Sequence, residues 1–307
     1  MTSPISGTQF VLKAGGYEAV VASVGASLRS LTFGGRNLVV PFSEDELRPF
    51  YSGAILAPWP NRVVGGRYTF NGSPQQLPIT EVARGHALHG LVVWADFDEI
   101  ESSDTSVRMT ASITAQDGYP HQLNISADYQ LDAAGLRVTV RAENHGTSAA
   151  PVGLGSHPYL VGGPGVVDEW TVEIPANEVL LVDKLLVPTG LSHVSGSVFD
   201  FREERLIGDI FIDHAYTSLI ARSDGVRRVR LLGPDRSGVE MTWGAELDWL
   251  QIHTADRPDM TSRTGLAVEP MTCPPDAFNS GTNLLTLDPG ASTSASWTIA
   301  ACRADLN

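Results

Sequence analysis

The stretch that decides the fold is LNISADYQLDAAGLRVTVRAE, residues 123–143. Apolar and polar residues alternate one by one on both sides of residues 132–135, a short segment that ends in glycine. Successive side chains of a β-strand point to opposite faces, so a period of two indicates strands with one buried face. Two such strands joined by a short glycine-bearing turn are predicted to form an antiparallel hairpin.

Similar turn sequences recur along the whole chain, each next to short apolar runs. They contain the Gly, Asn, Asp and Pro residues whose backbone angles turns require, and they lie at 34–35, 71–72, 233–238 and 288–290. Helical patterns are scarce, and only residues 43–47 are predicted to start a short helical turn. The sequence therefore predicts an all-β protein, a sandwich or a barrel-like assembly. No linker or repeat divides it, so residues 1–307 are expected to form a single domain.

The charge of the chain argues against nucleic-acid and membrane partners. Lys and Arg total 21 against 35 Asp and Glu, a formal net charge of −14, whereas such partners usually require a basic face. The one basic run, residues 227–230, alternates at strand spacing and is expected to be a solvated face. Only two cysteines occur, the N-terminus lacks the pattern of a signal peptide, and no long apolar run is present, so a cytoplasmic protein is expected. The sequence predicts no particular oligomeric state.

Four short motifs hold the residues that could carry chemistry. They are Pro-Trp-Pro-Asn-Arg at 58–62, His-Ala-Leu-His-Gly at 86–90, Ser-His-Pro-Tyr at 156–159 and Val-Glu-Pro at 268–270. Each puts a polar side chain beside a backbone restricted by proline or freed by glycine, which suits a position that must aim its side chain. The side chains so aimed are those of Arg62, His89, His157 and Glu269. Two histidines and a carboxylate can perform general acid–base catalysis without a metal or a cofactor.

These motifs, in this order, resemble those of a known family. Asn61-Arg62, Leu88-His89-Gly90, Ser156-His157-Pro158-Tyr159, Asp213-His214 and Glu269-Pro270, followed by Pro275-Asp276-Ala277-Phe278-Asn279, are similar to motifs of the aldose 1-epimerases, or mutarotases. The resemblance runs from roughly Gly15 to Trp297. It implies the large antiparallel β-sandwich of galactose mutarotase-like proteins, with very little helix and with a monosaccharide bound in a cleft on one sheet.

The resemblance also implies a role for each site residue. Glu269 is expected to act as the base on the C1 hydroxyl of the sugar, His157 as the acid at the ring oxygen, and His89 as a hydrogen-bonding group near that oxygen. The expected substrate-binding residues are Arg62, Asp213, Asn61 and Tyr159. Trp59 is a second aromatic candidate for the cleft. No metal or cofactor is expected. From the residues alone, a glutamate that follows an apolar pair at a strand end could be partly desolvated, which raises its pKa and makes it a better base.

Two departures from the family pattern leave the sugar unidentified. Leu91 follows His89-Gly90 where family members often carry a second glycine, and Trp59-Pro60 replaces a commoner aromatic–small pair. Galactose is therefore not assumed. One alternative is a mutarotase of an anionic sugar, phosphorylated or sulfonated, for which Arg84 is the visible cationic candidate. Another is a non-catalytic sugar-binding or regulatory protein on the same fold.

Two further hypotheses concern metal and thiol chemistry. His86, His89 and His157 with a carboxylate could form a zinc site, but the glycine-rich loop lacks the helical frame of His-Glu-x-x-His sites. Cys273 lies four residues after Glu269 and is expected to be a small buried thiol.

Overall fold

The computed structural model describes residues 4–257 and 262–303, which are built mainly from antiparallel strands. The strands are β1 Gln9–Ala14, β2 Tyr17–Ala22, β3 Ser27–Phe33, β4 Arg36–Asn37, β5 Ile55–Leu56, β6 Arg62–Val63, β7 Arg67–Phe70, β8 Ser73–Gln76, β9 Ala87–Leu88, β10 Asp98–Ser102, β11 Ser106–Ile113, β12 Leu123–Asp132, β13 Gly135–Asn144, β14 Ala150–Val152, β15 Gly155–Ser156, β16 Tyr159–Leu160, β17 Thr171–Glu173, β18 Ala176–Val182, β19 Pro188–His193, β20 Arg205–Leu206, β21 Asp213–Leu219, β22 Arg227–Leu232, β23 Ser237–Trp243, β24 Trp249–His253, β25 Leu266–Met271, β26 Leu285–Leu287 and β27 Ser292–Arg303. The helical segments are three 3-10 turns, η1 Pro49–Tyr51, η2 Val64–Gly66 and η3 Val167–Glu169, and the single-turn α1 Ala277–Ser280.

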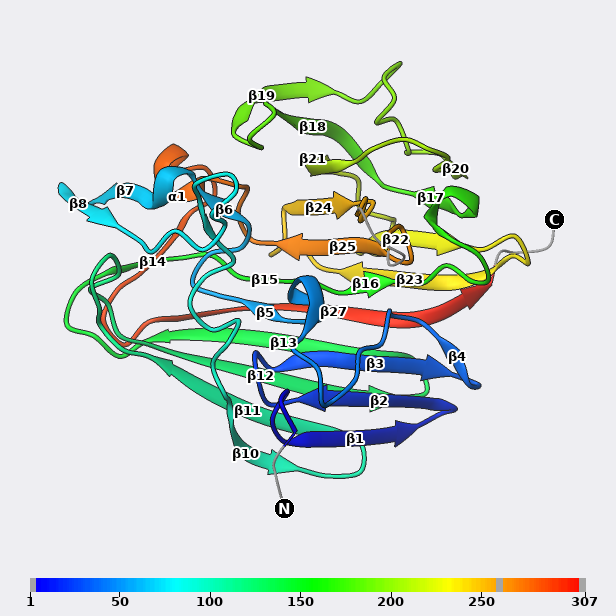
Figure 1. Cartoon of the computed structure of the whole chain (residues 1–307), viewed down its shortest axis with the longest axis horizontal. Coiled ribbons are helices and arrows are strands. Elements are labelled where there is room, and N and C mark those ends of the chain that lie inside the picture. The colour runs from blue at the N-terminus through cyan, green and yellow to red at the C-terminus, as the bar shows by residue number, and fades with distance from the viewer. Residues whose placement is uncertain (1–3, 258–261, 304–307) are drawn as a thin grey trace.

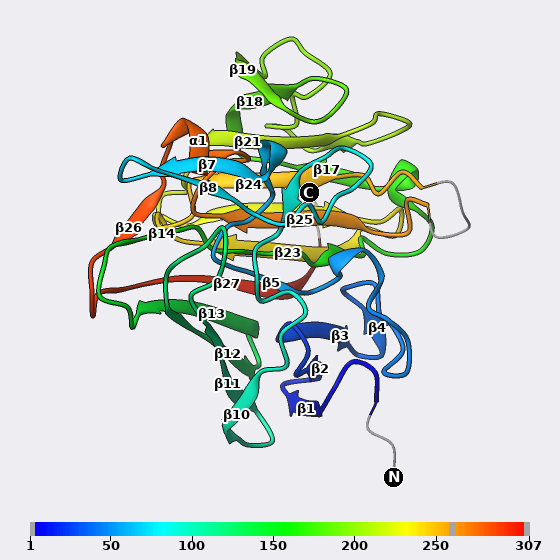
Figure 2. The same ribbon diagram turned by 60° about the vertical axis from the view of Figure 1, so that its left-hand side comes forward.

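Two large sheets dominate the architecture (Figures 1 and 2). The first has nine strands in the order β10-β11-β12-β13-β27-β23-β22-β17-β20, and the second has eight strands, β19-β18-β21-β24-β25-β15-β5, with β16 also paired to β25. A four-stranded sheet of β1 to β4 and three two-stranded sheets, β14-β26, β6-β9 and β7-β8, complete the fold. No helix among the described residues is long and apolar enough to cross a membrane.

The hairpin predicted from residues 123–143 is confirmed. β12 and β13 pair from Leu123↔Asn144 to Asp132↔Gly135, so that only two residues form the turn. Every second residue of β12 is buried, from Leu123 to Leu131, as the alternation requires. The predicted turn at 71–72 also joins two strands, since Phe70 pairs with Ser73.

The helical turn predicted at residues 43–47 is wrong. The segment forms a hydrogen-bonded turn in which Glu46 N–H donates to the carbonyl of Ser43. Leu47, the apolar residue that should have anchored a helix, is 70% exposed. Helices in proteins are stabilised mainly by packing an apolar face, and this segment has none. In the described part of the chain the one α-helical turn is α1, which overlaps the motif at residues 275–279.

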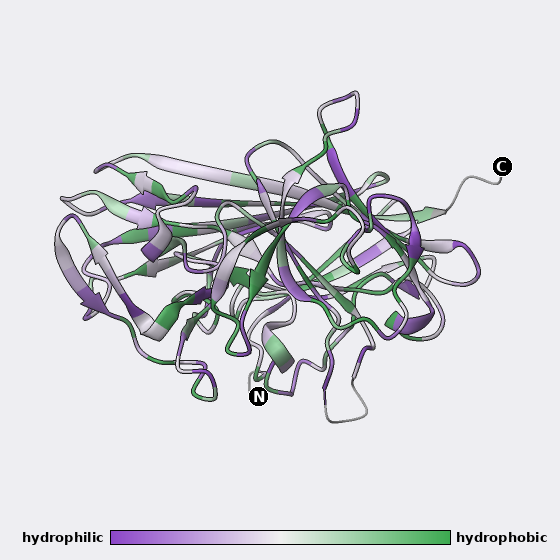
Figure 3. Cartoon of the chain, turned by 90° about the horizontal axis from the view of Figure 1, so that it is seen from above, coloured by the Kyte–Doolittle hydropathy of each residue, from purple (hydrophilic) through white to green (hydrophobic). Residues whose placement is uncertain are grey.

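The two large sheets bury one side of each in a shared hydrophobic core. That core contains Val138 and Trp297 of the nine-stranded sheet together with Leu250, Ile252 and Val268 of the eight-stranded sheet. Figure 3 shows hydrophobic stretches running through the middle of the molecule and hydrophilic ones in many of the peripheral loops. The two large sheets therefore share one continuous hydrophobic core.

The other side of the eight-stranded sheet carries polar groups. Because Leu250 and Ile252 of β24 point into the shared core, the side chains between them point to the opposite face. The same alternation applies on β25, where Val268 faces the core and its two neighbours face away. Gln251, His253 and Glu269 therefore share one face of the sheet, and the candidate site is built on that face.

Candidate active site

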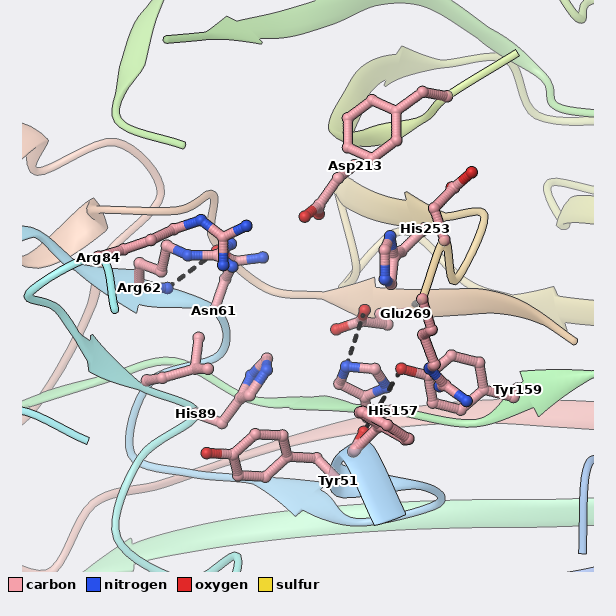
Figure 4. A pocket seen from close by; sticks show the side chains of 15 residues that line it. Tyr51, Asn61, Arg62, Arg84, His89, His157, Tyr159, Asp213, His253 and Glu269 are labelled. Carbon is pink, nitrogen blue, oxygen red and sulfur yellow. Dashed lines mark hydrogen bonds and ion pairs between the residues drawn. The ribbon is translucent and has the colours of Figure 1, made fainter. Parts of the chain in front are cut away.

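An open cleft of about 330 Å³ lies over this face of the eight-stranded sheet (Figure 4). Its size falls within the range of small-molecule sites, roughly 300–1,000 Å³. It is lined by Phe50, Tyr51, Asn61, Arg62, Arg84, Leu88, His89, His157, Tyr159, Phe211, Asp213, His253, Asp256, Arg257 and Glu269. All seven residues expected to form the site are in this group, although they come from segments spread over more than 200 positions.

Strand register explains how the floor of the cleft is assembled. Tyr159 pairs with Ala267, Ala267 with His253, and His253 with Asp213, which makes one row across four strands. Residues directly opposite in antiparallel strands place their Cβ atoms about 4.5–5.5 Å apart on the same face. Two positions along, Glu269 pairs with Gln251 in a second, parallel row. The sheet thus holds carboxylate, imidazole and phenol groups at fixed spacing.

His157, in the segment between β15 and β16, forms a buried pair with Glu269. His157 Nε2 lies 3.3 Å from Glu269 Oε1, and the side chains are only 7% and 2% exposed. The His157 backbone is fixed by two hydrogen bonds, since its N–H donates to the Ala54 carbonyl and its carbonyl accepts from Gly53 N–H. The other polar atoms of the pair, His157 Nδ1 and Glu269 Oε2, are buried and have no hydrogen-bond partner within the described part of the protein.

Burial shifts the protonation of this pair in opposite directions. It lowers the pKa of the His157 imidazole to about 3, with the neighbouring His253 adding to the shift. It raises the pKa of the Glu269 carboxyl well above its ordinary value of 4.5, and the nearby Asp213 carboxylate reinforces this while Arg62 opposes it. Desolvation disfavours the charged form of both groups. Burial therefore favours a neutral pair in which one proton is shared by the two groups.

His89 lies beside this pair in an unusual backbone conformation. Its ring centroid is 5.0 Å from that of His157 and 4.7 Å from that of Tyr51. His89 has a φ of 63° and its N–H donates to the Asn61 carbonyl at 2.8 Å. Burial lowers the pKa of its imidazole well below the ordinary value, and the positive charge that His157 can carry adds to this effect. A neutral imidazole can donate or accept a hydrogen bond at a developing charge.

Gly90 explains why the histidine loop needs a glycine. Its φ is 83°, and a Cβ at this position would lie 2.1 Å from the carbonyl oxygen of Ala57. Leu91, which departs from the family pattern, packs against the hydrophobic core and donates its N–H to the same carbonyl. The loop therefore accommodates a side chain at 91 on its core side.

Arg62 is held in place before any ligand binds. Its Nε and Nη2 donate to the two carboxylate oxygens of Glu81, at 2.8 and 3.0 Å, and its Nη1 donates to Asn61 Oδ1 at 3.1 Å. A guanidinium has five N–H donors, so two remain for a ligand. Strand β6, which contains Arg62, is held in place by Asp276, whose N–H donates to the Arg62 carbonyl and whose Oδ1 accepts from Val64 N–H. The motif at residues 275–279 thus serves to position Arg62.

Asp213 stands at the edge of the cleft with one oxygen engaged. Its Oδ1 accepts a hydrogen bond of 2.6 Å from Gln251 Nε2. Gln251 is 2% exposed, and its Oε1 has no partner among the described residues. The pairing orients the carboxylate and leaves lone pairs of Asp213 facing the cleft.

The structure corrects one expectation made from the sequence. Trp59 does not line the cleft: it is 3% exposed and packs in the core against Tyr119 and Phe278. Both ring nitrogens of His86, one of the histidines in the zinc alternative, are engaged by backbone groups, since Nδ1 accepts from Gly65 N–H and Nε2 donates to the Leu185 carbonyl. Among residues 4–257 and 262–303, no group of three or more His, Cys, Asp or Glu side chains is arranged to hold a metal ion.

Other expectations outside the site can be compared directly with the structure. The basic run on β22 lies away from the cleft, where Arg228 pairs with Glu173 and Glu240 as part of a ladder of ion pairs. Cys273 is a fully buried free thiol, as expected.

Several residues in or behind the cleft were missed by the sequence reasoning. Those that line it are His253, Phe50, Tyr51, Phe211, Asp256 and Arg257. Those that hold lining residues are Gln251 on β24, bonded to Asp213, and Glu81, bonded to Arg62. A signal existed for Gln251 and His253. In Leu-Gln-Ile-His, residues 250–253, two polar residues that can bind a ligand alternate with aliphatic residues of the core.

The fold and the grouping of these side chains fit one class of protein, enzymes that move protons on a sugar. The family model described as aldose 1-epimerase matches residues 8–300, and the chain belongs to this family. Its enzymes are isomerases that interconvert anomers, so the chain is an isomerase of the mutarotase type.

Individual relatives agree with this family. A protein of Escherichia coli (strain K12) named uncharacterized protein YihR is 38% identical over 286 residues, covering 93% of this chain and 90% of that protein. The galactose mutarotase of Rattus norvegicus is 33% identical over 168 residues, covering 52% of this chain and 47% of that protein. The crystal structure of the GalM/aldose epimerase homologue from C. elegans has a TM-score of 0.86 at 20% identity, covering 97% and 99% of the two chains. The predicted galactose mutarotase-like sandwich is confirmed.

Proposed function

We propose that this protein is an aldose 1-epimerase that interconverts the α and β anomers of a hexose by general acid–base catalysis. The observation that carries the proposal is the buried contact of 3.3 Å between His157 Nε2 and Glu269 Oε1 inside the cleft. Ring opening needs one group that takes a proton from the C1 hydroxyl and one that gives a proton to the ring oxygen. A pair of groups that shares a single proton can supply both.

The proton balance follows from the chemistry of the pair. When the shared proton lies on His157, Glu269 is a carboxylate and accepts the C1 hydroxyl proton as the C1–O5 bond breaks. His157 then donates its proton to the ring oxygen, which leaves an open-chain aldehyde, a protonated Glu269 and a neutral His157. Rotation about the C1–C2 bond followed by the reverse transfers closes the ring with the opposite configuration at C1. The neutral pair favoured by burial is the form that starts ring closure.

The remaining residues are proposed to hold the sugar. The two free N–H donors of Arg62 and the free oxygen of Asp213 would bind ring hydroxyls, while Asn61 and Glu81 keep the guanidinium in place. Tyr159 would provide an aromatic wall. His89 would donate to the ring oxygen and stabilise the charge that develops there, because a fixed dipole in a desolvated site is effective for this purpose.

The test is the rate of α-to-β interconversion of freshly dissolved glucose and galactose, followed by polarimetry. Wild-type protein should accelerate at least one of the two sugars, and Glu269→Gln and His157→Asn should each lose this acceleration while remaining folded. Arg62→Ala should mainly raise KM. If both single variants kept the wild-type rate, the assignment of the pair would be wrong. If the wild type bound sugar without acceleration, the protein would be a binding protein on the same fold.

A second candidate substrate is an anionic hexose, phosphorylated or sulfonated. The supporting observation is that Arg84 and Arg257 both line the cleft, Arg84 with its side chain 40% exposed and Arg257 stacked over the Phe50 ring at 3.5 Å. Glucose 6-phosphate should then have a lower KM than glucose, and Arg84→Gln should raise the KM of the phosphorylated sugar alone. Equal KM values for the two sugars would reject this candidate.

We further propose that the protein works in the cytoplasm and without a metal. Both cysteines, Cys273 and Cys302, are free thiols, which fits a reducing compartment. Acid–base ring opening needs no Lewis acid. Activity should therefore be unchanged after extensive dialysis against a chelator.

A further inference from the structure

His253 is a cleft residue that the proposed mechanism leaves without a role. It is the last residue of β24 and faces the cleft between Asp213 and Tyr159, with its imidazole directed toward Glu269 (Figure 4). It lies in the same cross-strand row as Asp213 and Tyr159. A half-buried imidazole at the centre of a ligand site is therefore available for binding.

The hydrogen bonds around Ile212 fix which nitrogen of His253 faces the cleft. His253 Nδ1 lies 3.3 Å from the Ile212 carbonyl oxygen, which can only accept, so Nδ1 must carry the hydrogen. Thr254 N–H occupies a second position on the same oxygen. The Thr254 hydroxyl does not compete, because its single hydrogen is used in a shorter contact with Asp256. In the neutral ring, Nε2 is then a lone-pair acceptor on the side away from Ile212.

His253 and Asp213 both line the open cleft, so a ligand in the cleft can reach this nitrogen. The residue next to His253 in the row, toward Tyr159, is Ala267, which is fully buried and packs against Tyr159. On the other side Asp213 has one carboxylate oxygen engaged by Gln251, and its second oxygen has no hydrogen bond from the described residues. The row therefore presents two hydrogen-bond acceptors beside each other, a carboxylate oxygen and an imidazole nitrogen. Two adjacent acceptors match two hydroxyl donors on neighbouring carbons of a sugar ring.

We propose that His253 is a specificity-determining residue whose Nε2 accepts a hydrogen bond from the sugar hydroxyl next to the one bound by Asp213. The enzyme then requires adjacent hydroxyl groups on the part of the ring that lies over Asp213 and His253. This inference rests on the proposed function, because it assumes that a hexose occupies the cleft. It differs from a catalytic role, since the His157–Glu269 pair already supplies one acid and one base.

The experiment compares His253 variants on a series of sugars that lack one hydroxyl each. Glucose and its deoxy analogues at C2, C3, C4 and C6 are assayed by NMR exchange spectroscopy between anomers, which gives kcat and KM. His253→Phe keeps the ring and removes both nitrogens, and His253→Gln keeps a terminal acceptor. His193→Phe is the matched control, because His193 is exposed at the end of β19. Circular dichroism confirms that each variant is folded.

The expected result is a change in KM that depends on one hydroxyl. His253→Phe should raise the KM of glucose roughly 5- to 100-fold, the usual cost of losing one buried hydrogen bond, with a much smaller change in kcat. The KM of His253→Gln for glucose should lie between those of His253→Phe and the wild type, and the KM of His193→Phe should equal that of the wild type. The deoxy sugar that lacks the hydroxyl bound by His253 should have a high KM with the wild type, and His253→Phe should not raise that KM further.

Other outcomes would overturn the proposal. An unchanged KM in a folded His253→Phe would do so, as would losses that do not depend on which hydroxyl is missing. A fall in kcat alone would make His253 part of proton transfer. Failure of the proposed function would be seen separately, because the wild-type protein would then accelerate no sugar. In that case the wild type and the His253 variants are compared by their sugar affinities, measured by titration calorimetry, in place of KM. A wild type that neither accelerates nor binds any sugar of the series would overturn both proposals.

Discussion

Removing either partner of the buried His157–Glu269 pair should change the pH dependence of stability, and the two changes should have opposite signs. Burial lowers the pKa of His157 from 6.5 to about 3 and raises that of Glu269 well above 4.5. In the unfolded chain both groups return to their ordinary values. Stability changes with pH wherever the folded and unfolded states bind different numbers of protons.

The signs follow from counting protons on the pair. Between pH 4.5 and 6.5 the unfolded chain has a charged Glu269 and a charged His157, hence one proton, and the folded pair also holds one. The contribution of the pair to stability is therefore nearly flat in this window. In Glu269→Gln only the histidine remains. Because its folded pKa is depressed, its contribution is present above pH 6.5 and is lost as the pH falls toward 3.

The magnitude can be worked out from these pKa values. At pH 5 about 97% of an unfolded histidine is protonated whereas the folded His157 is still neutral, so Glu269→Gln should lose about 1.6 kcal/mol between pH 6.5 and pH 5, the window in which the wild-type pair contributes almost no pH dependence. In His157→Asn only the glutamate remains, and its raised pKa gives the reverse dependence. Its contribution is present below pH 4.5 and is lost at up to about 1.4 kcal/mol per pH unit as the pH rises.

The assay is urea unfolding followed by tryptophan fluorescence at pH 5, 6.5 and 7.5 for the three proteins. The effect of other buried groups such as His89 cancels when Glu269→Gln is compared with the wild type, whereas His157→Asn also removes the His157 charge that helps to lower the pKa of His89. The two variants should diverge from the wild type in opposite directions as the pH changes. Parallel curves for Glu269→Gln and wild type would refute the reasoning, because His157 would then take up a proton in the folded protein as readily as in the unfolded chain.

Three further predictions concern binding, backbone geometry and metal independence. Glu81→Gln should raise KM about tenfold with little change in kcat, because it weakens the bidentate charge-assisted pair that orients Arg62; a selective fall in kcat in the anomer-exchange assay would contradict this. Gly90→Ala should lower the free energy of unfolding by more than about 3 kcal/mol, whereas Gly85→Ala, with a similar φ but open space around it, should cost about 1 kcal/mol, as measured by urea unfolding. Activity after chelator treatment should equal that of untreated protein, and a loss restored by a divalent metal would show that the acid–base account is incomplete.

The sequence predicted those parts of the fold that depend on neighbouring residues. The alternation in residues 123–143 specifies both strands and their turn, because strand period and turn chemistry are local properties. The order of motifs, by resemblance to the family, pointed to all seven proposed site residues, and the structure brings them into one cleft. Whether each performs its proposed role stays a prediction.

The parts that could not be predicted depend on long-range pairing. His253 enters the site because β24 pairs with both β21 and β25 in one register, and no local pattern sets that register. Trp59 was misplaced for a related reason. Its motif points toward the cleft, but the side chain faces the core, where Tyr119 and Phe278 from distant segments enclose it. Neighbouring residues of one motif can lie on opposite sides of the same backbone.

The separation of the two faces of the eight-stranded sheet has a consequence for evolution and for engineering. A slip of one residue in β24 would move Gln251 and His253 into the hydrophobic core and expose Leu250 and Ile252. A single error in strand register would therefore disrupt both the core and the site. Once the register is set, the cleft face can change independently. Side chains that line the cleft, such as His253, can be replaced to suit another sugar while Leu250, Ile252 and Val268 beneath the sheet keep their contacts.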